Sequence, residues 1–127
     1  TRRYPGVAIE ALRKDECDED CLAAVSLLIN TTSVGMKGDR IEFLNLEKVQ
    51  HTSKIYDMVY SPVITPLMND AAAKGMIVSN GLGMLAAQGE KAFLIWTGQM
   101  PPKGLMKRVL QGFCRPELQL DNNQYSS

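Results

Sequence analysis

Short, nearly continuous apolar runs separated by helix-like segments constrain the fold of this chain more than any other feature of its sequence. The runs have the length of strands and span residues 7–12, 25–30, 55–60 and 76–79. Strands that are apolar on both faces are usually buried on both faces, as the strands of a parallel sheet are. The pattern therefore predicts a parallel sheet.

The segments between these runs carry helix signals. Residues 18–24 open with acidic side chains, which favour the N-terminus of a helix. Thr65, followed by Pro66, suits the cap and first position of another helix. Residues 82–96 and 103–113 predict two more, the second with an apolar stripe. Strands alternating with helices indicate an α/β fold, here a partial Rossmann-like, doubly wound parallel sheet with flanking helices.

Composition limits the classes of partner. The chain has 127 residues, of which 45% are hydrophobic, so one domain with a real core is expected, followed by a polar tail at residues 114–127. The formal net charge is zero, which argues against a nucleic-acid or anionic-membrane surface. No apolar run approaches the roughly 18 residues that span a bilayer. We therefore expect neither a nucleic-acid nor a membrane partner.

The cysteines and the single histidine give no catalytic or metal signature. Cys17, Cys21 and Cys114 form a sparse, odd set that is typical of a reducing compartment. With no signal sequence in view, this favours a cytoplasmic protein, although a plastid form without its transit peptide would look the same. Cys17 and Cys21 lie four apart among acids, but no further Cys or His is near, so we expect no metal site. The flanks of His51 predict a surface position.

Polar residues or glycine follow three of the predicted strands, at residues 30–32, 60–62 and 80–81. The carboxyl ends of parallel strands share one rim, and ligands of open α/β sheets bind in the crevice outside that rim. Such residues also serve simply to turn a chain. Two of the three stretches lead directly into a predicted helix, so we take the rim as the candidate site.

Three motifs lie on this rim. They read LLINTTSVGM at residues 27–36, DMVYSPVITPLM at 57–68 and NGLGMLAAQGEKAFLIWTG at 80–98. In order and spacing they resemble the motifs of the shikimate dehydrogenase family. The resemblance covers the chain from about residue 6 to about residue 110.

The resemblance implies that residues 1–113 are the C-terminal portion of a dinucleotide-binding domain together with C-terminal helices. It implies an oxidoreductase of aromatic amino-acid biosynthesis that moves a hydride between NADP and shikimate or 3-dehydroshikimate. A quinate/shikimate dehydrogenase that uses NAD is the near alternative. A non-catalytic assembly or ligand-sensing module is another. Thr31, Ser33 and Asn80 replace the Ala, Pro and Asp of the family's pattern and mildly favour the module, whereas Tyr60 and Gln88 argue against it.

The resemblance also assigns roles to residues. Tyr60 and Gln88 match substrate-binding positions. Five residues fall at cofactor-binding positions: Asn30, Thr31, Met58, Gly81 and Met84. A hydroxylated acid is recognised by amide and hydroxyl groups, because each buried hydroxyl needs a partner. Without a Cβ, Gly81 would let a flat ring approach its backbone, and Met84 and Gln88 share a helix face.

The resemblance places the phosphate loop and the catalytic lysine and aspartate ahead of residue 1, so no catalytic residue is assigned within the chain. We expect the chain alone to be inactive. In the Rossmann strand order, residues 7–12 would be separated from the other strands by two that the chain lacks. Residues 25–30 would then expose an unpaired apolar edge, and we expect a partner there, either a missing N-terminal segment or a second copy.

Overall fold

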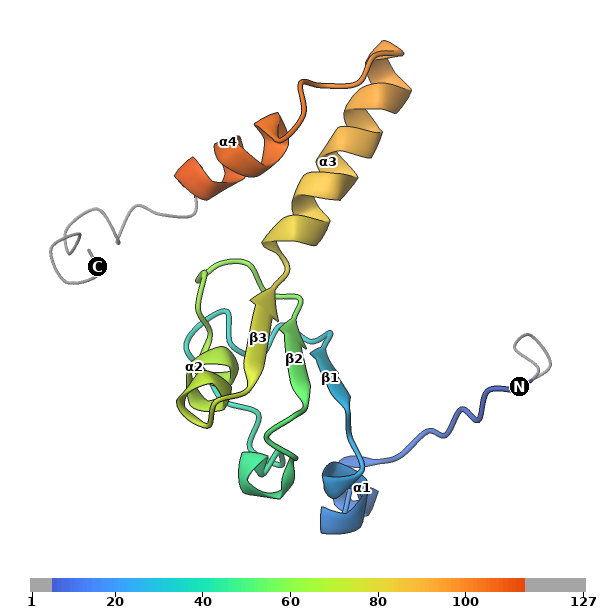
Figure 1. Ribbon diagram of the computed structural model, residues 1–127, viewed down its shortest axis with the longest axis vertical. Coiled ribbons are helices and arrows are strands. Elements are labelled where there is room, and N and C mark those ends of the chain that lie inside the picture. The colour runs from blue at the N-terminus through green and yellow to red at the C-terminus, as the bar shows by residue number, and fades with distance from the viewer. Residues whose placement is uncertain (1–5, 114–127) are drawn as a thin grey trace, which may run out of the picture.

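The computed structural model describes residues 6–113, which fold around a three-stranded parallel sheet (Figure 1). The strands are β1 (Leu27–Asn30), β2 (Lys54–Asp57) and β3 (Ile77–Asn80), in the order β1-β2-β3. The register pairs Asn30 with Asp57 and Asp57 with Asn80. The last residues of the strands therefore form one polar row across the sheet, and the predicted shared rim is confirmed.

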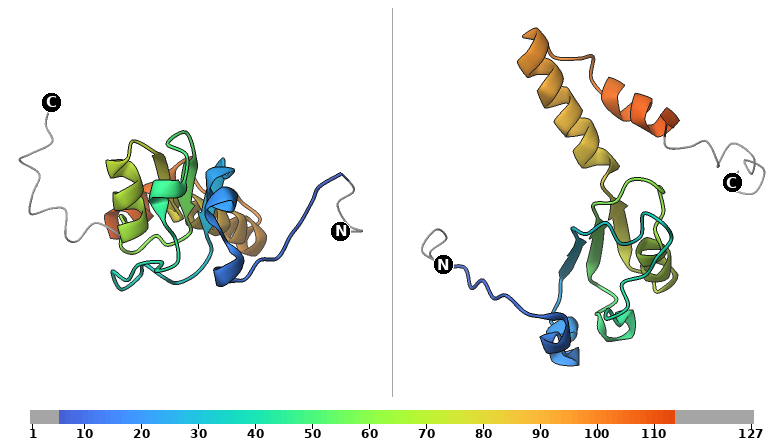
Figure 2. Two further views of the ribbon diagram at one scale, coloured as in Figure 1. Left: turned by 90° about the horizontal axis from the view of Figure 1, so that it is seen from below. Right: turned by 180° about the vertical axis from the view of Figure 1, so that it is seen from behind.

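Helices lie before, between and after the strands in the chain. Two short helices precede β1, one 3₁₀ turn lies between β1 and β2, one helix joins β2 to β3, and two helices follow β3. In chain order they are η1 (Lys14–Glu16), α1 (Glu19–Ala23), η2 (Leu46–Lys48), α2 (Pro66–Ala73), α3 (Leu82–Thr97) and α4 (Leu105–Phe113). Helices α3 and α4 pack on each other and project past the carboxyl ends of the strands (Figures 1 and 2).

Local capping chemistry explains where helices α1 and α2 begin. The Asp18 carboxylate accepts a hydrogen bond from the Cys21 amide at 2.8 Å. Thr65 Oγ1 accepts one from the Met68 amide at 3.3 Å, with Pro66 in the first position of α2. Both starts were predicted from the same residues. Helix α4 begins two residues later than predicted, because Gly104 has a left-handed φ of 76° that a helix cannot include.

The core lies on one face of the sheet. There, the inward side chains of the strands meet α2, α1 and the connection between β1 and β2. The buried core side chains are Leu22, Val49, Ile55, Leu67, Ala71 and Met76. On the opposite face, Leu27, Ile29 and Ile77 remain 52%, 50% and 66% exposed. The prediction that these strands are buried on both faces is wrong for the described chain, because α2 covers one face only.

The predicted strand at residues 7–12 does not form. This segment is irregular, with Val7 57% and Ile9 61% exposed, and it runs away from the sheet (Figure 1). A strand needs a paired neighbour, and within residues 6–113 none lies beside this segment. In the same part of the chain β1 pairs only with β2, so the expected unpaired apolar edge is confirmed.

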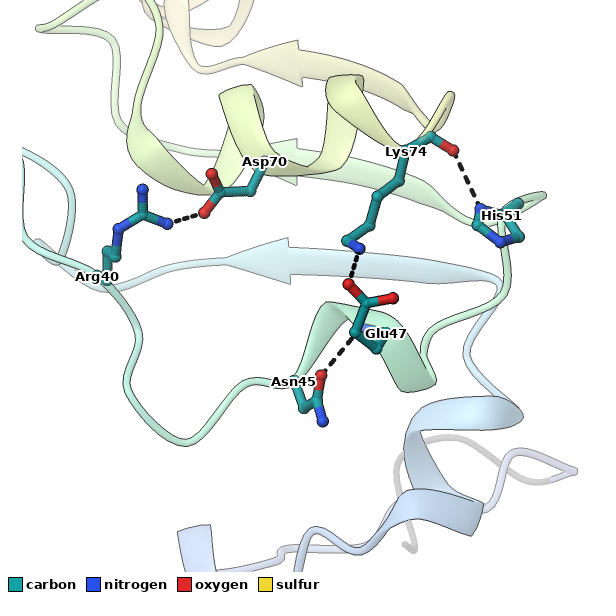
Figure 3. Close-up of polar contacts among 6 residues, drawn as sticks. All are labelled: Arg40, Asn45, Glu47, His51, Asp70 and Lys74. Atoms are coloured by element: carbon teal, nitrogen blue, oxygen red, sulfur yellow. Dashed lines mark hydrogen bonds and ion pairs between the residues drawn. The ribbon is translucent and has the colours of Figure 1, made fainter.

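Ion pairs tie the connection between β1 and β2 to helix α2 (Figure 3). Arg40 pairs with Asp70, and Glu47 pairs with Lys74. The His51 ring contacts the Lys74 carbonyl oxygen through Nδ1 at 3.0 Å. His51 is exposed, as predicted, and this contact gives it a structural role at the end of α2.

The Glu47–Lys74 pair makes a small part of the stability depend on pH. The hydrogen bond and charge of Lys74 hold the pKa of Glu47 below its ordinary value of 4.5. A lowered carboxyl pKa contributes stability above the unfolded pKa that is lost as pH falls through the folded pKa. We therefore expect Glu47→Gln to be slightly less stable than the wild type in urea at pH 7, with the difference shrinking as the pH falls below 4.5 and through the lowered pKa of the folded state. Glu42→Gln, in an exposed position of the same connection, is the control, and an equal loss there would contradict the assignment.

Two further predictions concern metals and membranes. Cys17 and Cys21 are free thiols, and within residues 6–113 no cluster of three or more Cys, His, Asp or Glu could hold a metal ion. Cys114 and the predicted tail lie outside the described residues. Over the same described range, no helix has both the length and the apolar character needed to cross a membrane.

Candidate functional site at the carboxyl rim

A buried carboxylate organises the rim. Asp57, at the end of β2, has no exposed surface. Its Oδ1 accepts hydrogen bonds from Asn30 Nδ2 and from the Val59 amide, each at 3.0 Å, and its Oδ2 accepts one from Thr65 Oγ1 at 2.6 Å. Asp57 therefore joins the turn after β1, the loop after β2 and the cap of α2. Strand β2 ends at Asp57, three residues before the predicted boundary at Tyr60.

Both polar atoms of the Asn30 side chain form hydrogen bonds within the protein. Its Nδ2 also donates to the Val34 carbonyl at 3.0 Å, and its Oδ1 accepts from the amide and hydroxyl of Thr32 at 3.0 and 2.7 Å. Only 3% of Asn30 is exposed. Its side chain shapes the turn, while the next residue, Thr31, is exposed and can meet a ligand.

Gly81 is a point of close backbone contact. A Cβ built on Gly81 would lie 2.1 Å from the carbonyl oxygen of Met58. The Gly81 amide also donates to the Val59 carbonyl at 3.3 Å, and its carbonyl accepts from the Leu85 amide at 3.0 Å. We predicted that the absent Cβ makes room for a ring, but Met58 fills that space. The glycine is needed to pack the start of α3 against the end of β2.

Helix α3 begins with a hydrogen bond to Asn80 rather than to the residue in the cap position. Gly81 occupies the cap position and has no side chain to cap the helix. The Asn80 side chain serves instead, because its Oδ1 accepts a hydrogen bond from the Leu82 amide at 3.1 Å. Its Nδ2 donates to the Val63 carbonyl at 2.9 Å, in the loop after β2. Asn80 therefore bridges that loop and α3.

A cleft of about 390 Å³ opens between this part of the rim and helix α4. Met84 lines it, together with Asn80 and Val63 from the rim and Lys107 and Gln111 from α4. The lysine and the two amides make this wall polar, and a Cβ at the neighbouring Gly83 would meet nothing within 4 Å. Of the predicted site residues, Met84 lies in this cleft.

The other predicted residues lie outside this cleft. Asn30 and Thr31 border a largely apolar groove of about 350 Å³ beside β1. Met58 is half-buried between Asn30, whose carbonyl accepts its amide at 3.0 Å, and Gly81. Tyr60 is 41% exposed, and Gln88 is exposed on α3. Asn30, Thr31, Met58, Tyr60 and Gly81 lie at or just after the strand ends, whereas Gln88 lies further along α3. The cleft beside α4 and the groove beside β1 hold different members of the predicted set.

Comparison with known proteins identifies the region. Residues 81–111 match the family model described as "Shikimate 5'-dehydrogenase C-terminal domain". A protein named shikimate dehydrogenase (NADP(+)) from Geobacter sp. (strain M21) is 50% identical over 93 residues, covering 73% of this chain and 32% of the relative. The chain belongs to the shikimate dehydrogenase family. It corresponds to that family's C-terminal region and spans about a third of the length of the relatives it matches.

Solved structures agree on the fold. The shikimate 5-dehydrogenase of Thermus thermophilus, described in complex with NADP(H) and shikimate, matches with a TM-score of 0.65 and 33% identity over 75% of this chain and 36% of that one. A quinate dehydrogenase from Corynebacterium glutamicum, in complex with NAD, matches with a TM-score of 0.68 and 26% identity over 78% and 35% of the two chains. The Rossmann-like class predicted from the sequence is thereby confirmed.

Proposed function

We propose that this chain forms the C-terminal part of an NADP-dependent shikimate dehydrogenase, which reversibly reduces 3-dehydroshikimate to shikimate. The observation that carries the proposal is that the fold brings the family's three motifs to the same side of the sheet. All three motifs meet at the rim, where the residues matched to cofactor and substrate lie on adjoining segments. The names of the relatives support the same activity and cofactor.

The residues at the rim suit these roles chemically. Tyr60 and Gln88 are exposed and carry a hydroxyl and an amide, which can pair with the hydroxyls of the substrate. Met58 and Met84 offer polarizable apolar surface for a flat ring, and the exposed Thr31 follows the turn that Asn30 holds. The bound nicotinamide would supply or accept the hydride.

We further propose that the chain does not catalyse the reaction alone. The family resemblance assigns none of its residues to proton transfer, and positioned acid–base groups usually contribute roughly 10²–10⁴-fold to rate. The segment that precedes this region in the relatives is our proposed partner for the exposed edge of β1. A second copy pairing along that edge is the alternative.

A chimera tests the proposed role of Gln88. Residues 6–113 would replace the matching C-terminal region of the Geobacter sp. (strain M21) relative. We expect Gln88→Ala in this chimera to lower kcat/KM for shikimate by roughly 10- to 100-fold, because a substrate hydroxyl loses its partner. Gln99→Ala, at an exposed position beyond α3, is the matched control. Equal rates for Gln88→Ala and the unaltered chimera would refute the assignment.

The same chimera compares how much Gln88 contributes with shikimate and with quinate. The quinate dehydrogenase neighbour resembles the fold as closely as the shikimate enzymes do, so NAD with quinate is the competing pair. Substitutions are made only in the grafted region, and kcat/KM is compared for shikimate and quinate. We expect Gln88→Ala to reduce the rate with shikimate more than with quinate. A larger loss with quinate would favour the alternative.

A further inference from the structure

Asn80 stands between two segments that carry the proposed substrate residues. It ends β3, it is half-buried, and it borders the cleft beside α4. The loop after β2 carries Tyr60, and α3 carries Gln88. Asn80 holds both segments through one side chain, with Nδ2 donating to the Val63 carbonyl and Oδ1 accepting from the Leu82 amide.

The loop is anchored at its ends by a different residue. Asp57 accepts from the Val59 amide at the start of the loop and from Thr65 Oγ1 at its end. Between these anchors, Ile64 is 58% exposed and Tyr60 41% exposed. Within residues 6–113, the bond from Asn80 to Val63 is therefore the hydrogen bond that holds the loop between these two anchors to the body of the protein.

We propose that Asn80 is a positioning residue that holds the loop after β2, which carries Tyr60, against the start of α3. We further propose that this clamp requires an amide side chain. An amide supplies both N–H donors and a carbonyl acceptor, and Val63 needs a donor while Leu82 needs an acceptor. An ionised carboxylate would keep the bond from Leu82 but would place an oxygen against the Val63 carbonyl oxygen. The proposal rests on the proposed function only in naming Tyr60 and Gln88 as substrate residues.

The chemistry predicts a pH signature for Asn80→Asp. An aspartate at this position could donate to Val63 only when protonated. The facing Val63 carbonyl raises the pKa of such a carboxyl, whereas the Leu82 amide and Lys107 in the same cleft lower it, so we expect a pKa near the usual value of about 3.9. The loop should therefore be loose when the carboxyl is ionised and closed when it is protonated. Asn80→Ala loses both bonds and should be loose at every pH.

Backbone order parameters of Tyr60, Val63 and Ile64, measured by NMR on the 127-residue chain without ligand, test the clamp. In the wild type we expect values near the rigid limit of about 0.85 from pH 7.5 to pH 4. Asn80→Asp should fall below about 0.6 at pH 7.5 and recover toward the wild type near pH 4. The Leu82 amide should stay protected from exchange in Asn80→Asp but not in Asn80→Ala.

Asn69→Asp makes the same chemical change at an exposed position of α2 and should leave the loop unchanged at both pH values. The proposal is overturned if Asn80→Asp keeps a rigid loop at pH 7.5, or if its loop is equally loose at both pH values. Because no substrate or cofactor is present, this result does not depend on whether the longer protein oxidises shikimate.

Discussion

Replacing Gly81 by alanine is expected to destabilise the fold by about 3 kcal/mol, at the upper end of the usual cost of overpacking. The new Cβ would lie 2.1 Å from the Met58 carbonyl oxygen and 2.7 Å from its carbonyl carbon. Both atoms belong to the backbone of the residue that follows β2 and cannot rotate away as a side chain can. The conformation of Gly81 itself, φ −73° and ψ −1°, suits any residue, so the cost is one of contact alone.

Gly83→Ala is the matched control for this substitution. Gly83 lies two residues further along, inside α3, and a Cβ there would meet nothing within 4 Å. Since alanine is favoured over glycine inside a helix by up to about 1 kcal/mol, this variant should be as stable as the wild type or more stable. Urea unfolding at pH 7 gives both values. A Gly81→Ala variant as stable as Gly83→Ala would show that the approach of Met58 is not tight.

Removing the Asp57 carboxylate is expected to cost about 4 kcal/mol, the second large effect. Asp57→Ala leaves Asn30 Nδ2, the Val59 amide and the Thr65 hydroxyl without their acceptor in a site with no solvent contact. Asp57→Asn should cost less, about 1 to 2 kcal/mol, because its carbonyl oxygen keeps the first two bonds.

The order of the Asp57 variants is the diagnostic result in urea unfolding. Asp15→Ala is the control, because the Asp15 side chain is 72% exposed and pairs with the exposed Arg13. We expect a change within about 0.5 kcal/mol there. If Asp57→Ala and Asp15→Ala unfold at the same urea concentration, the buried network does not organise the rim.

Local chemistry made much of this fold predictable. The caps at Asp18 and Thr65 lie within three residues of the amides that they bind, so the sequence alone reveals the starts of α1 and α2. The polar ends of β1 and β3 were also recognised in advance, since parallel strands must bring such ends together. The apolar run at residues 7–12 misled the prediction, because forming a strand depends on a neighbour that the described chain does not provide.

The roles of Asp57 and Asn80 depend on contacts that spacing does not reveal. The bond from Asn30 to Asp57 spans 27 positions, and it follows only once the register pairs these two residues. Asn80 was interpreted as a mild sign of degeneration, because the family's pattern has an aspartate there. Its two hydrogen bonds give the amide a positive function. Lys107 and Gln111 were not predicted as site residues, because they reach the cleft only when α4 folds back against α3.

The central claim is that the residues matched to cofactor and substrate form part of the active site of a shikimate dehydrogenase. Its most direct test is NADP reduction by the chimera that carries residues 6–113 in the Geobacter sp. (strain M21) relative, measured beside the 127-residue chain alone. We predict that the chimera oxidises shikimate with a kcat/KM within about tenfold of the unaltered relative, a difference of about 1.4 kcal/mol in transition-state stabilisation. The chain alone should show no turnover. A folded chimera without activity, or an active chain alone, would contradict the account.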